Sequence, residues 1–94
     1  MTEWPMTAEG WLEVLRPYGV RHVQVGGCLR DGRLRRMRRK AHAHSNLLDE
    51  QHGTVCVLSA KRLAQPTLMF HEAAHIYRRS WTEAQCDQWG RRKV

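Results

Sequence analysis

The sequence predicts an α+β domain in which a small, mostly antiparallel sheet packs against three helices. Three observations lead to this fold class. An almost uniformly apolar run at residues 54–58 is typical of a strand buried on both faces. An Asp-Gly pair at 31–32 predicts a hairpin turn. Helix start signals stand at Thr7, Pro66 and Thr82, so we expect an N-terminal, a central and a short C-terminal helix.

The first part of the chain predicts a helix followed by a strand. Thr7 can accept a hydrogen bond from the first helical turn, and the helix should run to about Arg16. A proline and a glycine shortly afterwards end it. Residues 20–25 then predict a strand, and the Gly26-Gly27 pair that follows predicts a bend or bulge.

Residues Arg30–Lys40 form the most basic segment and largely account for the formal net charge of +7. Leu34, Met37 and Ala41 have helical spacing, but a twisted basic strand fits equally well. The charge predicts either nonspecific contact with nucleic acid or attraction of an acidic protein substrate. The alternative is a solvated edge whose charges prevent aggregation between strands. No aromatic residue is interleaved with the basic ones, which argues against stacking on single strands.

Two histidines follow the basic segment. His42 and His44 alternate with alanines, so in a strand their side chains would point to the same side. A His-x-His pair without further ligands is a weak signal for a metal site, and surface or substrate-cleft histidines are the favoured interpretation. Cys56, within the apolar strand, is most simply a small core residue.

Composition favours a cytoplasmic domain. Ninety-four residues suit one domain, 1–94, with a modest core. The three cysteines, Cys28, Cys56 and Cys86, have no Cys-x-x-Cys spacing, which favours free thiols in a reducing compartment over disulfides. Neither a signal-peptide pattern nor an apolar run of membrane-spanning length is present, so no membrane contact is expected.

The pentapeptide His71-Glu72-Ala73-Ala74-His75 carries the chemistry of the central helix. Histidines four residues apart project from one helix face, so both imidazoles can bind one metal ion. Glu72 lies beside that face, where it can take a proton from a water at the metal. Apolar residues gather on the other side of the helix. On the pentapeptide alone, a solvated polar helix face is the competing interpretation.

A second helix follows after a short connection. Thr82 and Gln85 form a capping box, so this helix should begin at Glu83. Glu83 lies in its first turn and can supply a third zinc ligand, leaving a fourth position open for water. Asp87, one turn later, can bond the far nitrogen of a ligating histidine. Asp87 and Cys86 are also alternative third ligands.

The pattern His71-Glu72-x-x-His75 followed by Glu83-Ala84-x-x-Asp87 resembles that of gluzincin metallopeptidases. The small size is more similar to compact ImmA/IrrE-like and minimal phage-type zincins. The resemblance covers roughly residues 54–90, and only seven residues separate His75 from Glu83, fewer than in large gluzincins. It implies a minimal zincin-like domain whose sheet edge holds an extended peptide substrate beside the active-site helix.

The expected function is therefore that of a zinc metalloprotease. Zn²⁺ would be held by His71, His75 and Glu83, and Glu72 would act as the general base. The residue that stabilises the oxyanion stays open among four candidates, Tyr77, Arg78, Arg79 and His44.

The competing hypothesis is a basic nucleic-acid-binding or adaptor module with a structural or catalytically silent zinc. A closed site that uses Cys86 or His52 as fourth ligand would favour a structural zinc, whereas an open position favours catalysis.

Overall fold

The computed structural model describes residues 3–94 and shows a small α+β domain with three α-helices and two small sheets. The helices are α1 (Ala8–Leu15), α2 (Pro66–Tyr77) and α3 (Glu83–Lys93), and short 3₁₀ helices at Arg16–Tyr18 and Ala60–Ala64 follow α1 and precede α2. The strands are β1 (His22–Val25), β2 (Cys28–Arg30), β3 (Arg33–Arg35), β4 (Ala41–Ala43) and β5 (Thr54–Val57).

The larger sheet has the strand order β1-β5-β4. The central strand β5 pairs antiparallel with β4 and parallel with β1, with Val23 opposite Val55. The sheet is therefore mixed, and the expectation of a mostly antiparallel sheet is wrong for the β1–β5 pair. The reason is that the predicted turn at 31–32 closes a separate two-stranded sheet, β2–β3, rather than returning the chain to β1.

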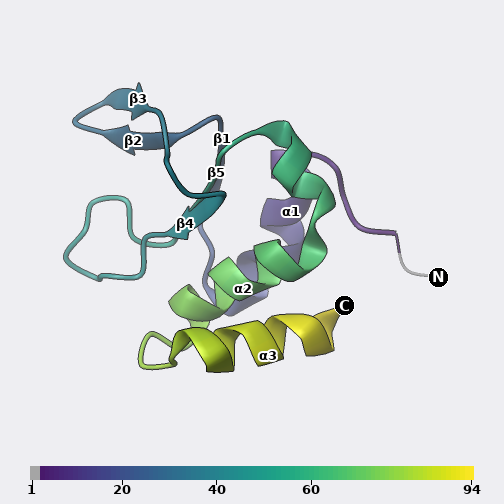
Figure 1. Ribbon diagram of the computed structural model, residues 1–94. Coiled ribbons are helices and arrows are strands. Elements are labelled where there is room, and N and C mark those ends of the chain that lie inside the picture. Colours follow the sequence, from purple (N-terminus) through teal and green to yellow (C-terminus); the bar gives the residue numbers. More distant parts are fainter. Residues whose placement is uncertain (1–2) are drawn as a thin grey trace.

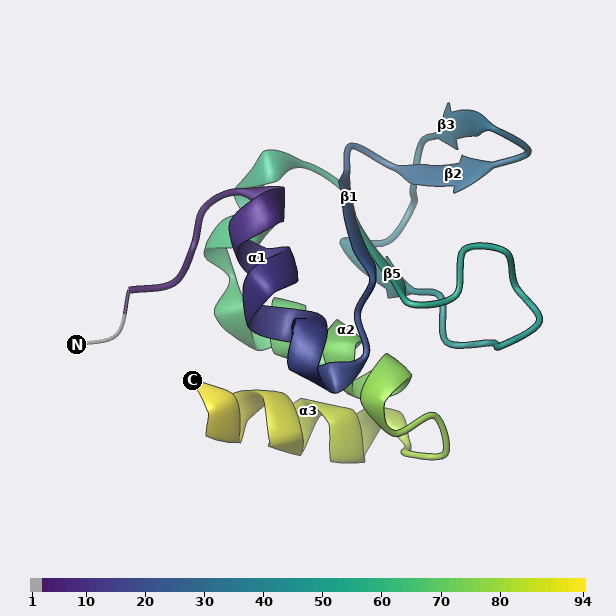
Figure 2. The same ribbon diagram turned by 180° about the vertical axis from the view of Figure 1, so that it is seen from behind.

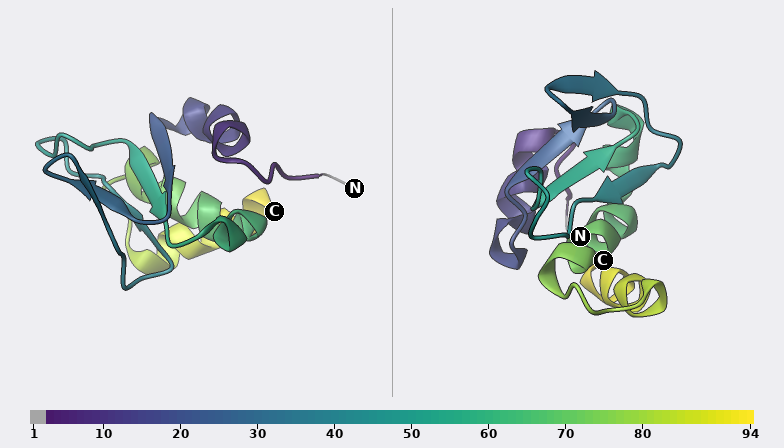
Figure 3. Two further views of the ribbon diagram at one scale, coloured as in Figure 1. Left: turned by 90° about the horizontal axis from the view of Figure 1, so that it is seen from above. Right: turned by 90° about the vertical axis from the view of Figure 1, so that its left-hand side faces the viewer.

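The Asp-Gly turn itself forms as predicted. Asp31 and Gly32 connect β2 to β3, and both have positive φ angles, 50° and 74°, as a tight two-residue hairpin turn requires. Gly26 and Gly27 also have positive φ angles, which lets the chain bend away from β1 into the hairpin. The hairpin and the loop between β4 and β5 extend away from the helices (Figures 1 and 3).

The hydrophobic core lies between the larger sheet and the helices α1 and α2. Val55 and Val57 are fully buried and belong to this core together with Trp11 and Leu15 of α1 and Met69 of α2. Because side chains alternate along a strand, residues between the two valines face the other side of the sheet. The core therefore uses one face of the sheet and leaves the other to the β2–β3 hairpin.

Helix α3 packs alongside α2, on the side away from the sheet (Figures 1 and 2). The predicted capping box is present: Thr82 Oγ1 accepts from the backbone N–H of Gln85, whose side chain accepts from the N–H of Thr82. The helix accordingly begins at Glu83, as expected. No helix among residues 3–94 is long and apolar enough to cross a membrane.

The basic segment adopts neither of the two expected forms over its whole length. Residues 33–35 form the exposed strand β3, and residues 36–40 then run without helix or strand to β4. The helical spacing of its apolar residues therefore does not produce a helix. Charge repulsion among closely spaced arginines disfavours the compact spacing of a helical turn, where like charges become neighbours.

Candidate metal centre

Helix α2 presents His71 and His75 toward α3. The side chains are 17% and 19% exposed, and their Nε2 atoms lie 3.3 Å apart. Pro66 is the first residue of α2, where a missing backbone N–H costs nothing. The helix then continues through both histidines to Tyr77. Two imidazole nitrogens thus converge on one point from successive helical turns, which is the geometry that the pentapeptide predicts.

Glu83 reaches the same point from the start of α3. One carboxylate oxygen lies 2.9 Å from Nε2 of His71, and the other lies 3.0 Å from Nε2 of His75. These are the nitrogens that an ion on this face would use. The structure therefore brings together two nitrogen atoms and one carboxylate that can ligate a metal ion, a combination that suits zinc.

Cys86 and Asp87 contact the far sides of the two rings. Sγ of Cys86 lies 3.5 Å from Nδ1 of His75, and Oδ1 of Asp87 lies 3.7 Å from Nδ1 of His71. The second distance is within ion-pair range but too long for a hydrogen bond. Asp87 also pairs with Arg91 at 2.9 Å. Both residues thus face Nδ1 rather than the Nε2 atoms that meet Glu83.

Glu72 also lies close enough to the histidines to share an ion with them. One ligand atom from each of His71, Glu72 and His75 lies within 4.8 Å of the others. Glu72 is only 8% exposed, whereas Glu83 is 76% exposed. Burial raises the pKa of the Glu72 carboxyl, and the neighbouring His71 partly opposes this shift. Two acidic groups of different character, one buried and one exposed, therefore flank the histidine pair.

The close approach of α3 to α2 depends on Gly90. A Cβ atom at this position would lie 3.0 Å from the carbonyl oxygen of Thr67 and 3.1 Å from the backbone nitrogen of His71. Gly90 is seven residues after Glu83, so the two lie on the same face of α3, two turns apart. The glycine thus sets the distance between the helices that Glu83 spans.

The four oxyanion candidates lie in different environments. His44 is buried, with its two ring nitrogens next to Asp49 and Cys56. The Tyr77 ring packs between Tyr18, Trp81 and Trp89, and its hydroxyl accepts from Arg78. Arg79 is exposed at the end of α2. His52, considered above as a fourth ligand, lies next to Arg21 and the backbone of Asp49.

A second group of potential ligands was not recognised from the sequence. Cys28, His44 and Cys56 each offer a ligand atom within 4.8 Å of the others. His44 is buried, so the interpretation of a surface histidine is wrong for this residue. Cys56 is buried, as expected, but on the face of the sheet away from the main core. All three cysteines of the chain are free thiols.

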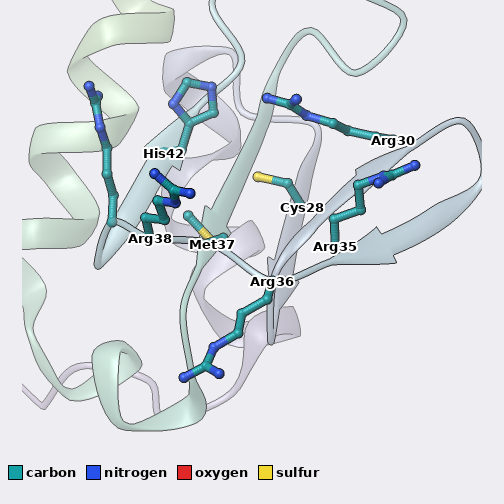
Figure 4. Close-up of a pocket in the computed structure, with 8 residues that line it drawn as sticks. Cys28, Arg30, Arg35, Arg36, Met37, Arg38 and His42 are labelled. Carbon is teal, nitrogen blue, oxygen red and sulfur yellow. The ribbon is translucent and has the colours of Figure 1, made fainter.

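The basic segment lines a pocket of about 410 Å³. Figure 4 shows its arginines around Cys28 and His42. The charge of Arg39, which lines the pocket, also acts on the carboxyl of Glu72 and on the ring of His42. Among the lining residues, Arg39 is thus the one whose charge reaches Glu72. The pocket lining is Cys28, Arg30, Arg35, Arg36, Met37, Arg38, Arg39 and His42.

Comparison of the chain with protein-family models, with curated proteins and with solved structures gives no match. The arguments that follow therefore depend on the geometry of the two clusters and on the pattern of the sequence.

Proposed function

We propose that this protein is a zinc-dependent peptidase whose metal is held by His71, His75 and Glu83. The observation that carries the proposal is the position of the Glu83 carboxylate, which lies within 3.0 Å of Nε2 of both histidines. Cys86 and Asp87 face Nδ1, on the other side of each ring, which supports Glu83 as the third ligand. Three protein ligands leave a position for water, as in catalytic zinc sites.

Glu72 is proposed as the general base. Zinc held by His71, His75 and Glu83 would acidify a bound water molecule and polarise the carbonyl of the scissile bond. Glu72 takes a proton from the attacking water, whose oxygen bonds to the carbonyl carbon, and delivers it to the amine as the C–N bond breaks. Its position supports this role, because a carboxylate oxygen of the buried Glu72 lies within 4.8 Å of a ligand atom of each histidine.

Strand β4 is an edge of the larger sheet, and this edge is proposed as the place for the substrate backbone. The carbonyl of Lys40 accepts from Leu58, and the N–H of His44 donates to Thr54, so these alternate residues bond to the β5 side. In an antiparallel pair, the intervening residues Ala41 and Ala43 direct their backbone groups outward. Strand β4 also contacts α2. An extended peptide added to β4 would therefore run beside the metal centre.

The arginine-lined pocket is proposed to favour acidic side chains in the substrate. A carboxylate pairs with guanidinium groups through charge-assisted hydrogen bonds, and the pocket presents several of them, of which Arg39 acts on Glu72. Nonspecific contact with nucleic acid through Arg30–Lys40 is the second proposal for the same charge. The concave shape of the pocket favours a compact acidic group over the long phosphate track of a duplex.

The test is hydrolysis of a peptide library by the zinc-loaded protein. We expect cleavage by the wild type and none by a His71→Ala/His75→Ala variant, with one metal per chain lost from this site. A His22→Ala variant, which removes an exposed histidine, is the matched control. Zinc content that is unchanged in the double variant would refute the α2 metal site, whereas a zinc-loaded wild type that is inactive on every peptide would favour the binding-module alternative.

A further inference from the structure

Three potential metal ligands meet on the face of the larger sheet that is opposite the helices. They come from β2, from the residue after β4 and from β5, and one ligand atom from each lies within 4.8 Å of the others. Sγ of Cys56 lies 3.5 Å from Nε2 of His44, and Cys28 completes the group. This cluster is separate from the His71–His75 pair on α2.

The sheet places two of these ligands together. Cys56 lies opposite His42, and the backbone N–H of His44 donates to the carbonyl of Thr54, two residues before Cys56, so His44 and Cys56 are diagonal neighbours across the strand pair. Val55 and Val57 face the helices, and alternation along the strand therefore turns Cys56 to the other face. Two residues far apart in the sequence thus become neighbours through strand pairing.

The β2–β3 hairpin brings the third ligand over this face. Gly26 donates to the carbonyl of Val57, and Gly27 then passes so close to the hairpin that a Cβ atom would lie 2.2 Å from the carbonyl oxygen of Arg35. With φ angles of 95° and 148°, these two positions favour glycine. They fix the point at which β2 begins, and its first residue is Cys28.

Asp49 orients the histidine of the cluster. Nδ1 of His44 lies 2.8 Å from Oδ2 of Asp49, while Oδ1 of the same carboxylate accepts from the backbone N–H of Gln51. A carboxylate on Nδ1 favours the tautomer with the proton on Nδ1, which leaves the lone pair on Nε2, the atom that faces Cys56. A carboxylate on the far nitrogen is the usual support of a metal-binding histidine.

We propose that Cys28, His44 and Cys56 bind a second zinc ion, independently of the site on α2. Two sulfur ligands and one imidazole select a thiophilic ion, and zinc takes this set in tetrahedral geometry. Cys28 lines the arginine-rich pocket, so water from the pocket would complete the ligand set. The ion ties β2 to the sheet, which stabilises a domain with a modest core.

Metal content and cobalt spectra of the reduced full-length chain test this proposal. We expect two zinc ions in the wild type, one in His71→Ala/His75→Ala and one in Cys28→Ala/Cys56→Ala. Cobalt substitution should give a strong thiolate-to-cobalt charge-transfer absorption in the wild type and in the histidine variant, and none in the cysteine variant. His42→Ala, a neighbouring histidine outside the cluster, should keep this absorption. The proposal does not rest on peptidase activity, because the absorption is measured in a chain that lacks the α2 histidines.

A milder variant covers the case in which the cysteine variant does not fold. Asp49→Asn keeps all three ligands and should weaken binding of the thiolate-bound metal by about 10- to 100-fold. If the three residues form only a hydrogen-bonded cluster without metal, no variant should show the charge-transfer absorption. If Cys28 and Cys56 instead form a disulfide, the metal-free chain should contain one reactive thiol before reduction. Either of these results, or loss of the absorption in His42→Ala, would overturn the three-ligand zinc site.

Discussion

One carboxylate oxygen of Glu83 lies 2.9 Å from Nε2 of His71, although the two residues belong to different helices. The other oxygen reaches His75, one turn further along α2. A connection of seven residues between His75 and Glu83 is therefore long enough to place the carboxylate over both rings. The short spacing, which departs from the large gluzincins, does not prevent the contact.

The first prediction concerns this carboxylate. Glu83→Gln should weaken zinc binding by more than the roughly 10- to 100-fold that we expect for Asp87→Asn, because a neutral amide replaces a charged oxygen ligand. Competition with a chromophoric chelator measures both affinities. Glu13→Gln, at an exposed carboxylate on α1, should change nothing. Full affinity in Glu83→Gln, with loss in a Cys86 or Asp87 variant, would show that the third ligand was chosen wrongly.

The second prediction separates Glu72 from the ligands. Glu72→Gln should keep zinc and fold while turnover falls by on the order of 100- to 10,000-fold, because the amide cannot accept the proton of the attacking water. Peptide hydrolysis and metal content are measured on the same preparation. If zinc is lost together with activity, Glu72 is a ligand, as its distance from both histidines also permits.

The third prediction uses the contact between α2 and α3. Gly90→Leu should lower the free energy of unfolding by about 1–3 kcal/mol, because its side chain meets the backbone of Thr67 and His71. Glu83 then moves away from the histidines, so zinc affinity should fall although no ligand has changed. Gln88→Leu, on the exposed face of the same helix, is the control. Unchanged affinity in Gly90→Leu would mean that the helix spacing does not determine the site.

The fourth prediction concerns the arginine-lined pocket. Arg35→Gln/Arg36→Gln should raise the KM for peptides with a glutamate near the scissile bond and leave glutamine analogues unaffected. Peptide pairs that differ only at this position give the comparison. Lys61→Gln, at an exposed basic residue outside the pocket, should have no effect.

A parallel measurement examines nucleic acid with a variant that carries Arg35→Gln, Arg36→Gln, Arg38→Gln and Arg39→Gln. If the segment binds duplex DNA, affinity should fall steeply with salt in the wild type and less steeply in this variant. A wild type that does not bind at low salt would leave the acidic peptide as the proposed partner.

Local signals in the sequence predicted the parts of the fold that depend on neighbouring residues. The capping box at Thr82 gave the start of α3, and the Asp31-Gly32 pair gave the hairpin, because both act through residues a few positions apart. The spacing of His71 and His75 likewise depends on one helix alone.

The parts that could not be predicted depend on strand pairing over long separations. The parallel partner of β1 is β5, more than 30 residues away, and no local pattern encodes that choice. The Cys28–His44–Cys56 cluster was missed for the same reason, because its members meet only after β4 has paired with β5 and the hairpin has folded over them. Spacing rules for metal ligands start from pairs a few residues apart, such as Cys-x-x-Cys, and this cluster contains no such pair.

The order of the strands has a consequence for how the chain reaches its native state. Strands β1 and β4 both precede β5 in the chain and do not pair with each other, so neither has a sheet partner until β5 joins them. The β2–β3 turn and the α2–α3 pair form from nearby residues and can appear quickly, whereas the sheet requires closure of a long loop. We therefore expect the docking of β5 to limit the folding rate, and the exposed edges of β1 and β4 to make unfinished chains prone to association.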